Sequence, residues 1–517
     1  MEPLTTVIIQ AGGKGTRMRH LTENKPKCLV SIGGQPILNS ISVAFGPKLK
    51  YIIIADYKSS VLETYLNTFP PPFEYDIVRA DGYGTASGIE SARNLSGDEG
   101  FVLVWSDLLF TEKVDFSGVK MNSVAFTTEN TCRWSIFNKK IVEEPNSLTN
   151  HLGIPGLFFF PKPGQLPKVP SSGEFVKYLA EIDIPLDFLE ITGIKEIGSF
   201  EAYRKERDKR FNSRFFNNVH LDSGRVVKEA KTKQFDKLVL DEIGWYKFVS
   251  RLNFDNIPNI ISYEPLTMDF IDGYHPFECV SGVGSKDCNK NDLLNSILSA
   301  LQDLHNLGST NYSVNTSKEV FIKKTIDRIT KISGIIPHID SDFFIVDGKK
   351  VMNLLHPTHY GAIEHLVDKV LRYGASRYTV IHGDPTFSNI MIQRDKRKTI
   401  FIDPRGYFGD IKIFGDPLYD YAKLYYSAVG NYDFFNQGRF YLRMSGKEVE
   451  VKVESEGFEK TEEIFENIVK TNLPALRLLH SLIWLSLSGY VIDDYDAILG
   501  SFFRGLKLFQ EVWDEYA

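Results

Sequence analysis

Three polar side chains in the second half of the chain have the types and the spacing that phosphoryl transfer requires. The stretch from His382 to Asn389 reads His-Gly-Asp-Pro-Thr-Phe-Ser-Asn, and Asp403 follows after a short charged turn. Phosphoryl transfer uses one Asp to accept the hydroxyl proton, an Asn a few residues on to bind magnesium, and a second Asp to bridge the metal to the phosphates. Asp384, Asn389 and Asp403 occur in that order, so the spacing predicts a magnesium-dependent site that uses ATP.

A second phosphate-handling pattern lies near the N-terminus, directly after an apolar strand. It consists of Gln10, Ala11, Gly12, Gly13, Lys14, Gly15, Thr16 and Arg17. Phosphates need many N–H donors at close range, and glycine lets the backbone approach without a Cβ in the way. Lys14 and Arg17 add fixed positive charge. Two sites built for nucleotides predict a bifunctional enzyme.

The composition limits the kinds of protein this chain can be. At 517 residues it is too long for one core, so two or three domains are expected. The net charge of -6 gives no basic field for nucleic acid or an anionic membrane, and we expect neither partner. No apolar run approaches ~18 residues, and the first residues lack the pattern of a signal peptide. These features predict a cytoplasmic protein. They do not fix the oligomeric state, and a homo-oligomer is compatible with them.

Four cysteines are scattered without metal-type or paired spacing. They are Cys28, Cys132, Cys279 and Cys288. This usage suits a reducing compartment, and we expect free thiols.

Short apolar runs in the first third of the chain predict an α/β domain. They lie at 6–9, 51–54, 101–104 and 156–160, with helix-compatible segments between several of them. Continuous apolar strands that alternate with helices indicate a mostly parallel sheet covered on both faces. The charged run 204–210 interrupts this pattern, and we interpret it as the linker between domains at 1–205 and 206–517.

The second domain is predicted to have two lobes. Strand-like 225–228 and helix-like 237–252 indicate a small mixed lobe at about 211–275. Long segments with helical spacing dominate from about 290, which predicts a helical lobe at about 276–517. The acidic stretch 448–463 is weakly patterned, and we expect a surface loop there.

Two further motifs accompany the N-terminal glycine loop. Lys25-Pro26-Lys27 follows it at short range, and Gly33-Gly34-Gln35-Pro36 opens the next element. Together the motifs resemble the sugar-phosphate nucleotidyltransferase family over roughly residues 4 to 205. The resemblance implies a Rossmann-like domain that joins a nucleotidyl group to a phosphate monoester and releases pyrophosphate. It implies that Lys14 and Arg17 bind the triphosphate, and that Lys27 contacts the acceptor phosphate or the bond being formed.

The same resemblance implies roles for three more positions. The turn formed by Gly84, Thr85 and Ala86 matches the family's base-contacting turn. Asp107, after a buried strand, matches its magnesium-binding Asp, at the strand end where open α/β sheets place ligands. Glu196 stands where the family has a second metal carboxylate. A solvated residue at a helix start is an equal alternative for Glu196.

Arg133 and Trp134 lie where residues of this first site could bind the acceptor. Arg133 could clamp a phosphate or carboxylate, or form a surface salt bridge. We interpret Trp134 as a core aromatic residue.

The C-terminal motif is accompanied by features in the order that kinases place them. Lys228 is a strand lysine for the α- and β-phosphates, and Glu242 in the next helix can pair with it. Met268 lies in a hinge-like segment that would meet adenine. With the segment 415–422, these features resemble the aminoglycoside phosphotransferase and choline kinase family over roughly 211–517. The resemblance implies a bilobal, protein-kinase-like α+β fold.

The acceptor of this second site has fewer signals. Arg405 could contact a phosphate or an anionic acceptor, or pair locally with Asp410 or Asp416. The last helices carry aromatic residues and carboxylates that would suit an ammonium group, although such residues are more often core and solvated face. They are Trp484, Tyr490, Asp493, Asp494, Tyr495 and Asp496.

The two predicted activities are chemically consecutive, and their fusion would supply product at high effective concentration. The leading hypothesis is a kinase plus cytidylyltransferase that uses ATP, CTP and Mg²⁺ on a small alcohol such as choline, for surface glycan decoration such as capsule or lipopolysaccharide. The alternative is an anomeric sugar kinase plus a sugar-1-phosphate uridylyl- or guanylyltransferase. A regulatory protein with degenerate sites is less favoured, because the polar residues of both sites are present.

Overall fold

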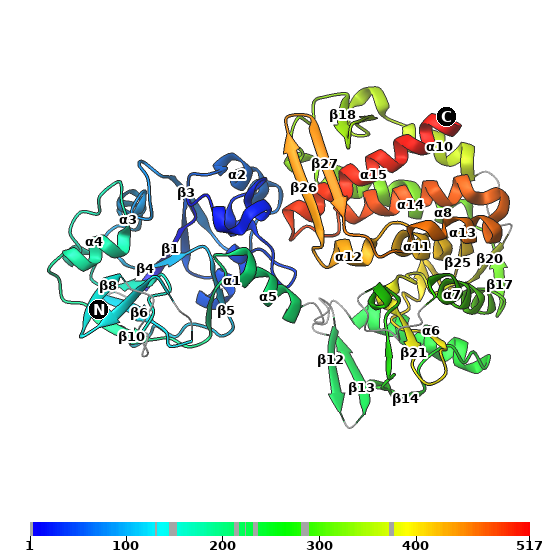
Figure 1. The fold of residues 1–517 in the computed structure, drawn as a ribbon, viewed down its shortest axis with the longest axis horizontal. Coiled ribbons are helices and arrows are strands. Elements are labelled where there is room, and N and C mark those ends of the chain that lie inside the picture. The colour runs from blue at the N-terminus through cyan, green and yellow to red at the C-terminus, as the bar shows by residue number, and fades with distance from the viewer. Residues whose placement is uncertain are drawn as a thin grey trace. The chain divides into compact units, whose positions relative to one another are not determined.

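The structure, a computed structural model, describes residues 4–129, 132–143, 152–210, 217–222, 224–230, 236–280, 289–371 and 377–517. The chain divides into two compact units, which we describe separately (Figure 1). The first comprises Met1–Ser213 with Ile492–Tyr495, and the second comprises Arg214–Val491 with Asp496–Ala517.

The first unit is built on a seven-stranded sheet with the order β10-β6-β9-β4-β1-β2-β3. Its strands are β1 (Leu4–Gln10), β2 (Lys50–Ala55), β3 (Tyr75–Arg79), β4 (Gly100–Trp105), β6 (Ser123–Phe126), β9 (Leu157–Phe160) and β10 (Asp187–Glu190). All neighbouring pairs are parallel except the two that involve β9. The predicted Rossmann-like fold with a mostly parallel sheet is therefore confirmed for this unit.

Helices and two small strand pairs complete the unit. The helices are α1 (Ile37–Phe45), α2 (Ser59–Thr68), α3 (Ile89–Ser96), α4 (Phe175–Glu181) and α5 (Phe200–Arg210). The small pairs join β5 (Leu108–Phe110) to β11 (Ile194–Glu196) and β7 (Trp134–Phe137) to β8 (Lys140–Glu143). The charged run 204–210, which we interpreted as a linker, is the second half of α5.

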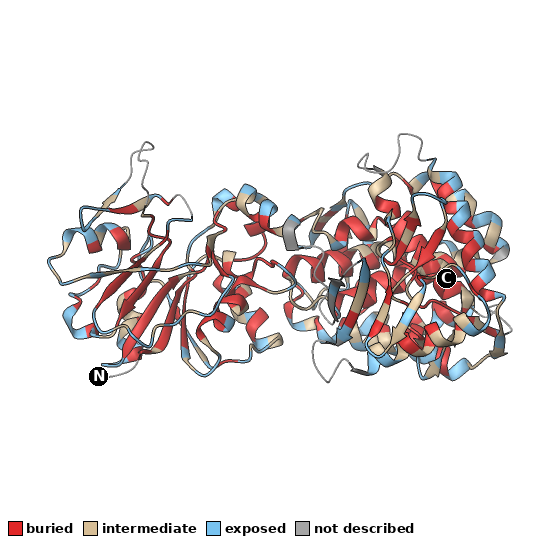
Figure 2. Ribbon diagram, turned by 90° about the horizontal axis from the view of Figure 1, so that it is seen from below, coloured by how far each residue is buried: buried red, intermediate tan, exposed pale blue. Residues whose placement is uncertain are grey.

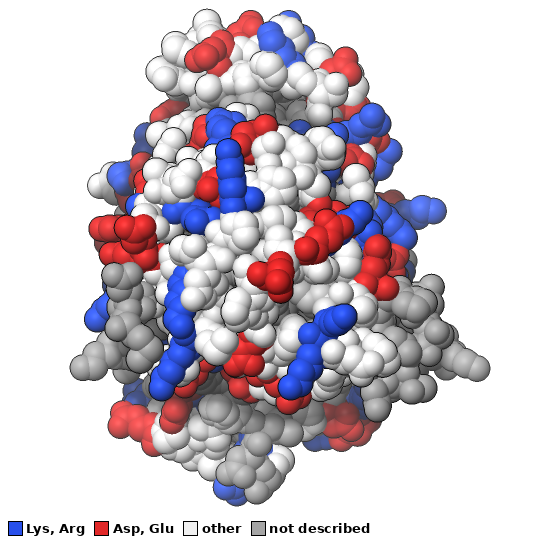
Figure 3. All heavy atoms as spheres, turned by 90° about the vertical axis from the view of Figure 1, so that its left-hand side faces the viewer, with Lys and Arg blue, Asp and Glu red and all other residues white. Residues whose placement is uncertain are grey.

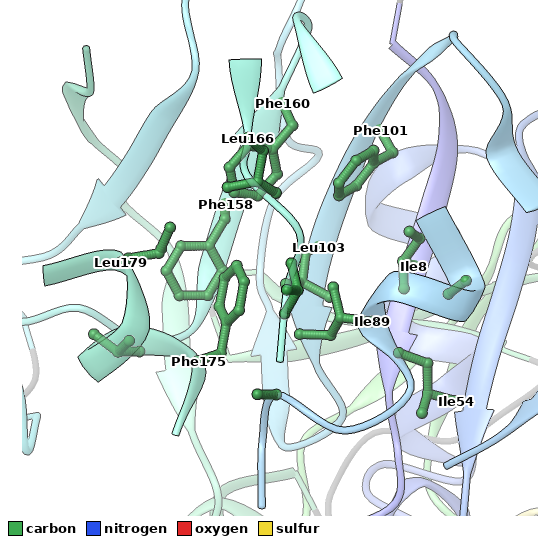
Figure 4. Close-up of a cluster of buried hydrophobic side chains, with 14 of the residues drawn as sticks. Ile8, Ile54, Ile89, Phe101, Leu103, Phe158, Phe160, Leu166, Phe175 and Leu179 are labelled. Atoms are coloured by element: carbon green, nitrogen blue, oxygen red, sulfur yellow. The ribbon is translucent and has the colours of Figure 1, made fainter. Parts of the chain in front are cut away.

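The strands form because their side chains are apolar on both faces and the helices cover them. Figure 4 shows one side of this core, where Ile8 and Leu103 of the sheet meet Ile89 of α3. Phe175 of α4 packs edge-on against Phe158, with ring centroids 5.2 Å apart. Figure 2 shows the buried central strands and the exposed outer faces of the helices. This packing fixes the carboxyl ends of β1 and β4, where the candidate residues lie.

The second unit begins with antiparallel strands and one long helix. The four-stranded sheet has the order β12-β13-β15-β14, and α6 follows β13 in the chain. Their bounds are β12 (Asn217–Asp222), β13 (Arg225–Ala230), α6 (Asp236–Arg251), β14 (Ile260–Tyr263) and β15 (Leu266–Asp269).

The remainder of the second unit is mostly helical. Its helices are α7 (Lys290–His305), α8 (Val314–Lys318), α9 (Lys324–Lys331), α10 (Ala362–Val370), α11 (Pro417–Ala428), α12 (Tyr432–Asn436), α13 (Glu462–Val469), α14 (Leu473–Ser488) and α15 (Tyr495–Tyr516). A π-helical turn, Glu319–Lys323, joins α8 to α9. Both α9 and α11 pack against α14.

Short strands accompany these helices. Their bounds are β16 (Gly273–Tyr274), β17 (Ser309–Asn311), β18 (Phe343–Val346), β19 (Lys349–Met352), β20 (Arg377–Val380), β21 (Ile390–Gln393), β22 (Thr399–Phe401), β23 (Tyr407–Phe408), β24 (Ile411–Lys412), β25 (Phe414–Gly415), β26 (Phe440–Ser445) and β27 (Glu448–Val453). They form the sheets β16-β21-β22, β17-β20-β25, β19-β18-β27-β26 and β23-β24.

Two predictions from the sequence are wrong. The first half of the acidic stretch 448–463 is not a loop, because β27 pairs with β26 and buries Val449 and Val451. The expectation of free thiols holds for Cys28 and Cys132 but fails at Cys279, which is disulfide-bonded.

The distribution of charge and the hydropathy of the helices can be described for the visible face and the described residues. On the face seen in Figure 3, Lys and Arg side chains are interspersed with Asp and Glu, without an extended field of one sign. Among the helices that the structure describes, none is long and apolar enough to cross a membrane.

Candidate active sites

The first candidate site gathers at the carboxyl end of the first unit's central strands. The loop after β1 begins with Gln10, whose buried amide donates to the carbonyls of Thr85 and Ser87 at 2.8 and 2.9 Å. This side chain therefore ties the glycine loop to the turn predicted to contact the base. Gly15 has φ +63°, a left-handed conformation that suits glycine.

The intervening loop residues have the exposure that a phosphate-binding loop needs. Gly13, Lys14 and Thr16 are exposed, and Arg17 keeps 68% of its side chain in solvent. Backbone N–H groups and two cationic side chains are thus accessible on one loop.

The turn at Gly84, Thr85 and Ala86 is held against the segment before α4. The amide of Ala86 donates to the carbonyl of Gly173 at 3.0 Å, and Thr85 Oγ1 accepts from the amide of Phe175 at 2.9 Å. Gly84 has φ +82°, and a Cβ there would lie 2.3 Å from the Gly173 carbonyl oxygen. Glycine is therefore required at this position by both conformation and space.

The predicted metal residues of the first unit converge on Gly198. A Cβ on Gly198 would lie 2.8 Å from Asp107 Oδ2, 2.9 Å from Glu196 Oε1 and 3.0 Å from a terminal nitrogen of Arg17. Two carboxylates and a guanidinium thus surround one small space that glycine keeps open. Glu196 lies at the end of β11, so the helix-start alternative is wrong.

A lysine completes this cluster. Lys27 Nζ forms an ion pair with Asp107 Oδ2, and both side chains are largely buried. Arg17 forms a 3.4 Å ion pair with Glu196. Burial raises the pKa of Glu196, and the negative charge of Asp107 raises it further. Two carboxylates that repel each other in this way are suited to share a cation.

The donor set fits magnesium bound to a substrate. Mg²⁺ is commonly held by one or two carboxylates, with phosphate oxygens and water as its other ligands. Asp107 and Glu196 supply that pair beside Gly198. Within the described ranges, no group of three or more His, Cys, Asp or Glu side chains could hold a metal alone.

Arg133 and Trp134 have structural partners. Arg133 pairs with Glu143 and Glu174, both at 2.7 Å, which is the surface salt-bridge alternative. Trp134 is half-buried and packs against the hydrophobic core, as we interpreted from the sequence.

The second candidate site is assembled from the antiparallel sheet and the helical part of the second unit. Lys228 on β13 pairs with Glu242 on α6 at 2.6 Å, and both side chains are buried. Lys228 also contacts Asp403. Met268 on β15 lies opposite Val226 in the same sheet and is buried.

Asp384 and Asn389 lie side by side. The Asn389 amide donates to the Asp384 carbonyl at 2.8 Å, and it lies 3.4 Å from the Asp384 carboxylate. The amide of Ile402 donates to the Asn389 carbonyl at 3.0 Å, which places Asp403 next to the same segment. The structure therefore brings together all five polar residues predicted for this site: Lys228, Glu242, Asp384, Asn389 and Asp403.

A buried carboxylate, that of Asp420, fixes the loop that carries Asp384. Asp420 lies in the segment 415–422, but no role of its own was predicted for it from the sequence. Asp420 on α11 accepts hydrogen bonds from the amides of His382 and Gly383, both at 2.8 Å. His382 also contacts the carbonyl of Ile402 at 3.0 Å. These contacts fix the position of the Asp384 loop relative to the Asp403 loop.

The electrostatics of Asp384 keep its carboxylate ionised. Burial alone would raise its pKa, but the charges of Lys423 and Arg405 lower it well below the usual range. Lys423 Nζ lies 2.9 Å from Asp384 Oδ1. Arg405 pairs with neither Asp410, which accepts from Thr316, nor Asp416, which caps α11.

The aromatic residues suggested for an ammonium acceptor do not form one pocket. Trp484 is fully buried, and Arg504 lies over its ring at 4.9 Å. Tyr490 is exposed and lies under Arg328, with the guanidinium carbon 5.4 Å from its ring centroid.

Comparison with known proteins finds similarity in the first unit. Residues 6–133 match the family described as Nucleotidyl transferase. The bifunctional protein GlmU of Methanococcus maripaludis (strain C7) is 30% identical over 122 residues, which is 23% of this chain and 29% of the relative. The uridylyltransferase AglF of Haloferax volcanii, named for UTP and glucose-1-phosphate, is 40% identical over 58 residues, 11% of this chain and 24% of the relative. The chain thus spans less than a third of the length of these relatives.

Solved structures align with about two fifths of the chain. HddC from Yersinia pseudotuberculosis covers 40% of this chain and 99% of its own, at 20% identity and a TM-score of 0.34. The CTP:phosphocholine cytidylyltransferase LicC from Streptococcus pneumoniae covers 40% and 97%, at 20% identity and a TM-score of 0.30. The family match itself lies within the first unit, at residues 6–133.

Proposed function

We propose that the chain is a bifunctional transferase that carries out two consecutive reactions on one small molecule. The second unit phosphorylates a hydroxyl group of a small alcohol with ATP. The first unit then joins a nucleotidyl group to that phosphate and releases pyrophosphate. The observation that carries the proposal is that each unit gathers its own set of cations and carboxylates, around Gly198 in the first and around Asp384 in the second.

In the first reaction, an acceptor hydroxyl oxygen bonds to the γ-phosphorus of ATP, and the bond from that phosphorus to ADP breaks. Asp384 accepts the hydroxyl proton, a role for which its ionised carboxylate is suited. Lys228, oriented by Glu242, binds the α- and β-phosphates. Met268 lies on the hinge strand that would face adenine.

In the second reaction, an oxygen of the new phosphate bonds to the α-phosphorus of the incoming nucleotide, and pyrophosphate leaves. Lys14 and Arg17 bind the triphosphate from the exposed loop, and Lys27 neutralises the acceptor phosphate near Asp107. The turn at Gly84 and Ala86 borders the base.

Magnesium has candidate ligands in both units. Asp107 and Glu196 would hold it in the first, and Asn389 and Asp403 in the second. When bound, it supplies charge neutralisation on the phosphates. The residues around it orient the reacting oxygens.

For the nucleotide we favour CTP, so that the product is a CDP-linked alcohol of the kind used to decorate surface glycans. The pairing of a compact N-terminal domain with a second domain that resembles choline kinases supports this choice, because choline kinase and phosphocholine cytidylyltransferase act in sequence. UTP with a sugar phosphate is the second candidate, because the printed name of AglF gives that reaction.

The test incubates the full chain with ATP, Mg²⁺ and each of the four nucleoside triphosphates. The acceptors are choline, ethanolamine, glycerol, glycerate and common hexosamines, and mass spectrometry detects the conjugate. We expect one triphosphate to give a conjugate only when ATP is also present. A conjugate that forms equally well without ATP, or no conjugate from any combination, would contradict the proposal.

A further inference from the structure

A group of four cations lies next to Asp384 in the second unit, and the phosphate-binding roles above do not use them. They are Lys324 and Arg328 on α9, Arg405 after Asp403, and Lys423 on α11. We call these four residues the basic cluster. All four are partly accessible to solvent.

The cluster is held together by aromatic rings. Lys324 and Lys423 lie over the Tyr419 ring, with Nζ atoms 5.8 and 5.9 Å from its centroid. Arg328 lies over Tyr490, and Arg405 lies 5.8 Å from the Tyr407 ring centroid. The faces of these rings attract cations without a carboxylate.

The backbone after α14 passes close to α9, which brings Tyr490 to Arg328. Arg328 also donates to the carbonyl of Ser486 near the end of α14 at 3.0 Å. A Cβ on Gly489 would lie 2.5 Å from the Arg328 carbonyl oxygen. Glycine at this position lets the chain reach Tyr490 directly beside α9.

Only Lys423 of the cluster forms an ion pair with a carboxylate that the structure describes. Lys423 pairs with Asp384, whereas Lys324, Arg328 and Arg405 form no salt bridge with any residue that the structure describes. Cations taken partly out of water cost free energy unless an anion accompanies them. Burial lowers the pKa of Lys324 to about 8, and the nearby charges of Arg405 and Arg328 contribute to this. An anion brought by a substrate would relieve the repulsion.

The position of the cluster indicates which substrate brings that anion. Asp384 is the group that receives the acceptor's proton, and Lys423 and Arg405 act on its carboxylate directly. Lys324 and Arg328 extend the cluster along α9, away in sequence from the nucleotide-binding strand β13. We propose that the acceptor of the second unit is an anionic alcohol, whose carboxylate or phosphate group is bound by Lys324 and Arg328 while its hydroxyl faces Asp384.

This inference rests on the proposed kinase function and narrows its substrate class. A cationic alcohol such as choline would be repelled by the same charges. The choline hypothesis from the sequence therefore gives way to an alcohol that carries a carboxylate or a phosphate.

The test measures binding and turnover separately with four probes of similar size: choline, glycerol, glycerate and glycerol phosphate. Binding to the full chain is measured by calorimetry with a non-hydrolysable ATP analogue and Mg²⁺, and turnover by phosphate transfer from ATP. We expect glycerate or glycerol phosphate to bind at least about tenfold more tightly than glycerol and choline. Whichever of glycerate and glycerol phosphate binds more tightly shows whether the site recognises a carboxylate or a phosphate.

Variants identify the residues responsible. Lys324→Gln and Arg328→Gln are each expected to raise the acceptor KM about tenfold, with the KM for ATP unchanged. Lys323→Gln is the matched control, because Lys323 directly precedes Lys324 but is exposed and pairs with Asp327 and Glu319 instead. Circular dichroism checks that each variant folds.

The outcomes separate this inference from the kinase proposal. Tighter binding of choline or glycerol, or anion binding that survives in both variants, would overturn the anionic acceptor even if phosphate transfer occurs. If these variants instead raised the KM for ATP, the cluster would bind the nucleotide, and the anionic acceptor would be overturned. Anion binding that depends on Lys324 and Arg328, without any phosphate transfer, would support the anion site and count against the kinase.

Discussion

At the scale of single residues, Gly198 is the position on which the first site depends most closely. The sequence contained it only as part of the motif around Glu196, and its role is visible once Asp107, Glu196 and Arg17 surround it. No local pattern could predict this, because Asp107 follows β4 and Glu196 ends β11, and the two positions are far apart in the chain.

We predict that Gly198→Ala reduces nucleotidyl transfer strongly and leaves the fold intact. The new Cβ would displace the ends of three flexible side chains, which can move aside, but it would fill the space between the two carboxylates. Pyrophosphate release measures the effect, and thermal unfolding checks the fold. Gly118→Ala is the control, because a Cβ there meets nothing within 4 Å. Full activity in Gly198→Ala would show that this space is not used.

The titration of Lys324 gives a second prediction at this scale. Its pKa is lowered to about 8, so it loses its charge as the pH rises through that value. The groups around it are Arg328, Arg405, Lys423 and Tyr419. Burial would raise the pKa of Tyr419, but the charges of Lys324, Lys423 and Arg405 lower it to about 7. As the pH rises, Lys324 loses its positive charge and Tyr419 gains a negative charge, so the cluster becomes less positive. Acceptor affinity should therefore fall between about pH 7 and about pH 9.

Lys324→Arg tests that explanation. Arginine stays protonated throughout this range, so the variant should lose the part of the pH dependence near pH 8 while it retains affinity at neutral pH. Isothermal titration with glycerate or glycerol phosphate across the range measures it. An unchanged pH profile in Lys324→Arg would exclude Lys324 as the titrating group.

At the scale of elements, sequence patterns predicted those strands and helices whose periodicity is strong. The runs at β1, β2, β4 and β9 are apolar because both faces of the sheet are covered. The hairpin β26–β27 was missed, although its Glu-Val-Glu-Val-Lys-Val segment alternates with a period of two and buries its valines. The segment was predicted to be a loop because its acidic residues were given more weight than the alternation of its valines.

The turn next to this hairpin contains a buried carboxyl group that we expect to control stability. Glu456 is fully buried, and its Oε1 accepts from the amide of Phe434 at 2.9 Å. Burial raises its pKa to about 9, and the charge of Asp433 contributes. The folded state therefore holds a proton that the unfolded state releases at its ordinary pKa.

This difference fixes the sign of the pH dependence. Between the unfolded pKa near 4.5 and the folded value near 9, the native state binds more protons, so stability falls as pH rises. The Glu456 contribution is at most about 1.4 kcal/mol per pH unit. Glu456→Gln copies the protonated shape and should flatten this slope, as measured by urea unfolding at several pH values. An identical slope in the variant would contradict the assignment.

At the scale of the whole molecule, the two units contain separate sets of reactive groups. The Asp384-to-Asn389 spacing is local and was readable from sequence. The basic cluster combines α9, α11 and the loop after Asp403, so only the fold brings it together. This is why the sequence predicted two activities but favoured a cationic acceptor that the second unit's charges oppose.

The most direct test of the account compares two substitutions in the full chain. Asp384→Asn should abolish phosphate transfer from ATP to the alcohol, while nucleotidyl transfer to an acceptor phosphorylated beforehand continues. Asp107→Asn should give the reverse result, with each loss about 10²-fold or larger. Mass spectrometry of both products reports the two steps in one reaction. If either substitution stopped both reactions in a folded protein, the two sites would not act independently, and the account would be contradicted.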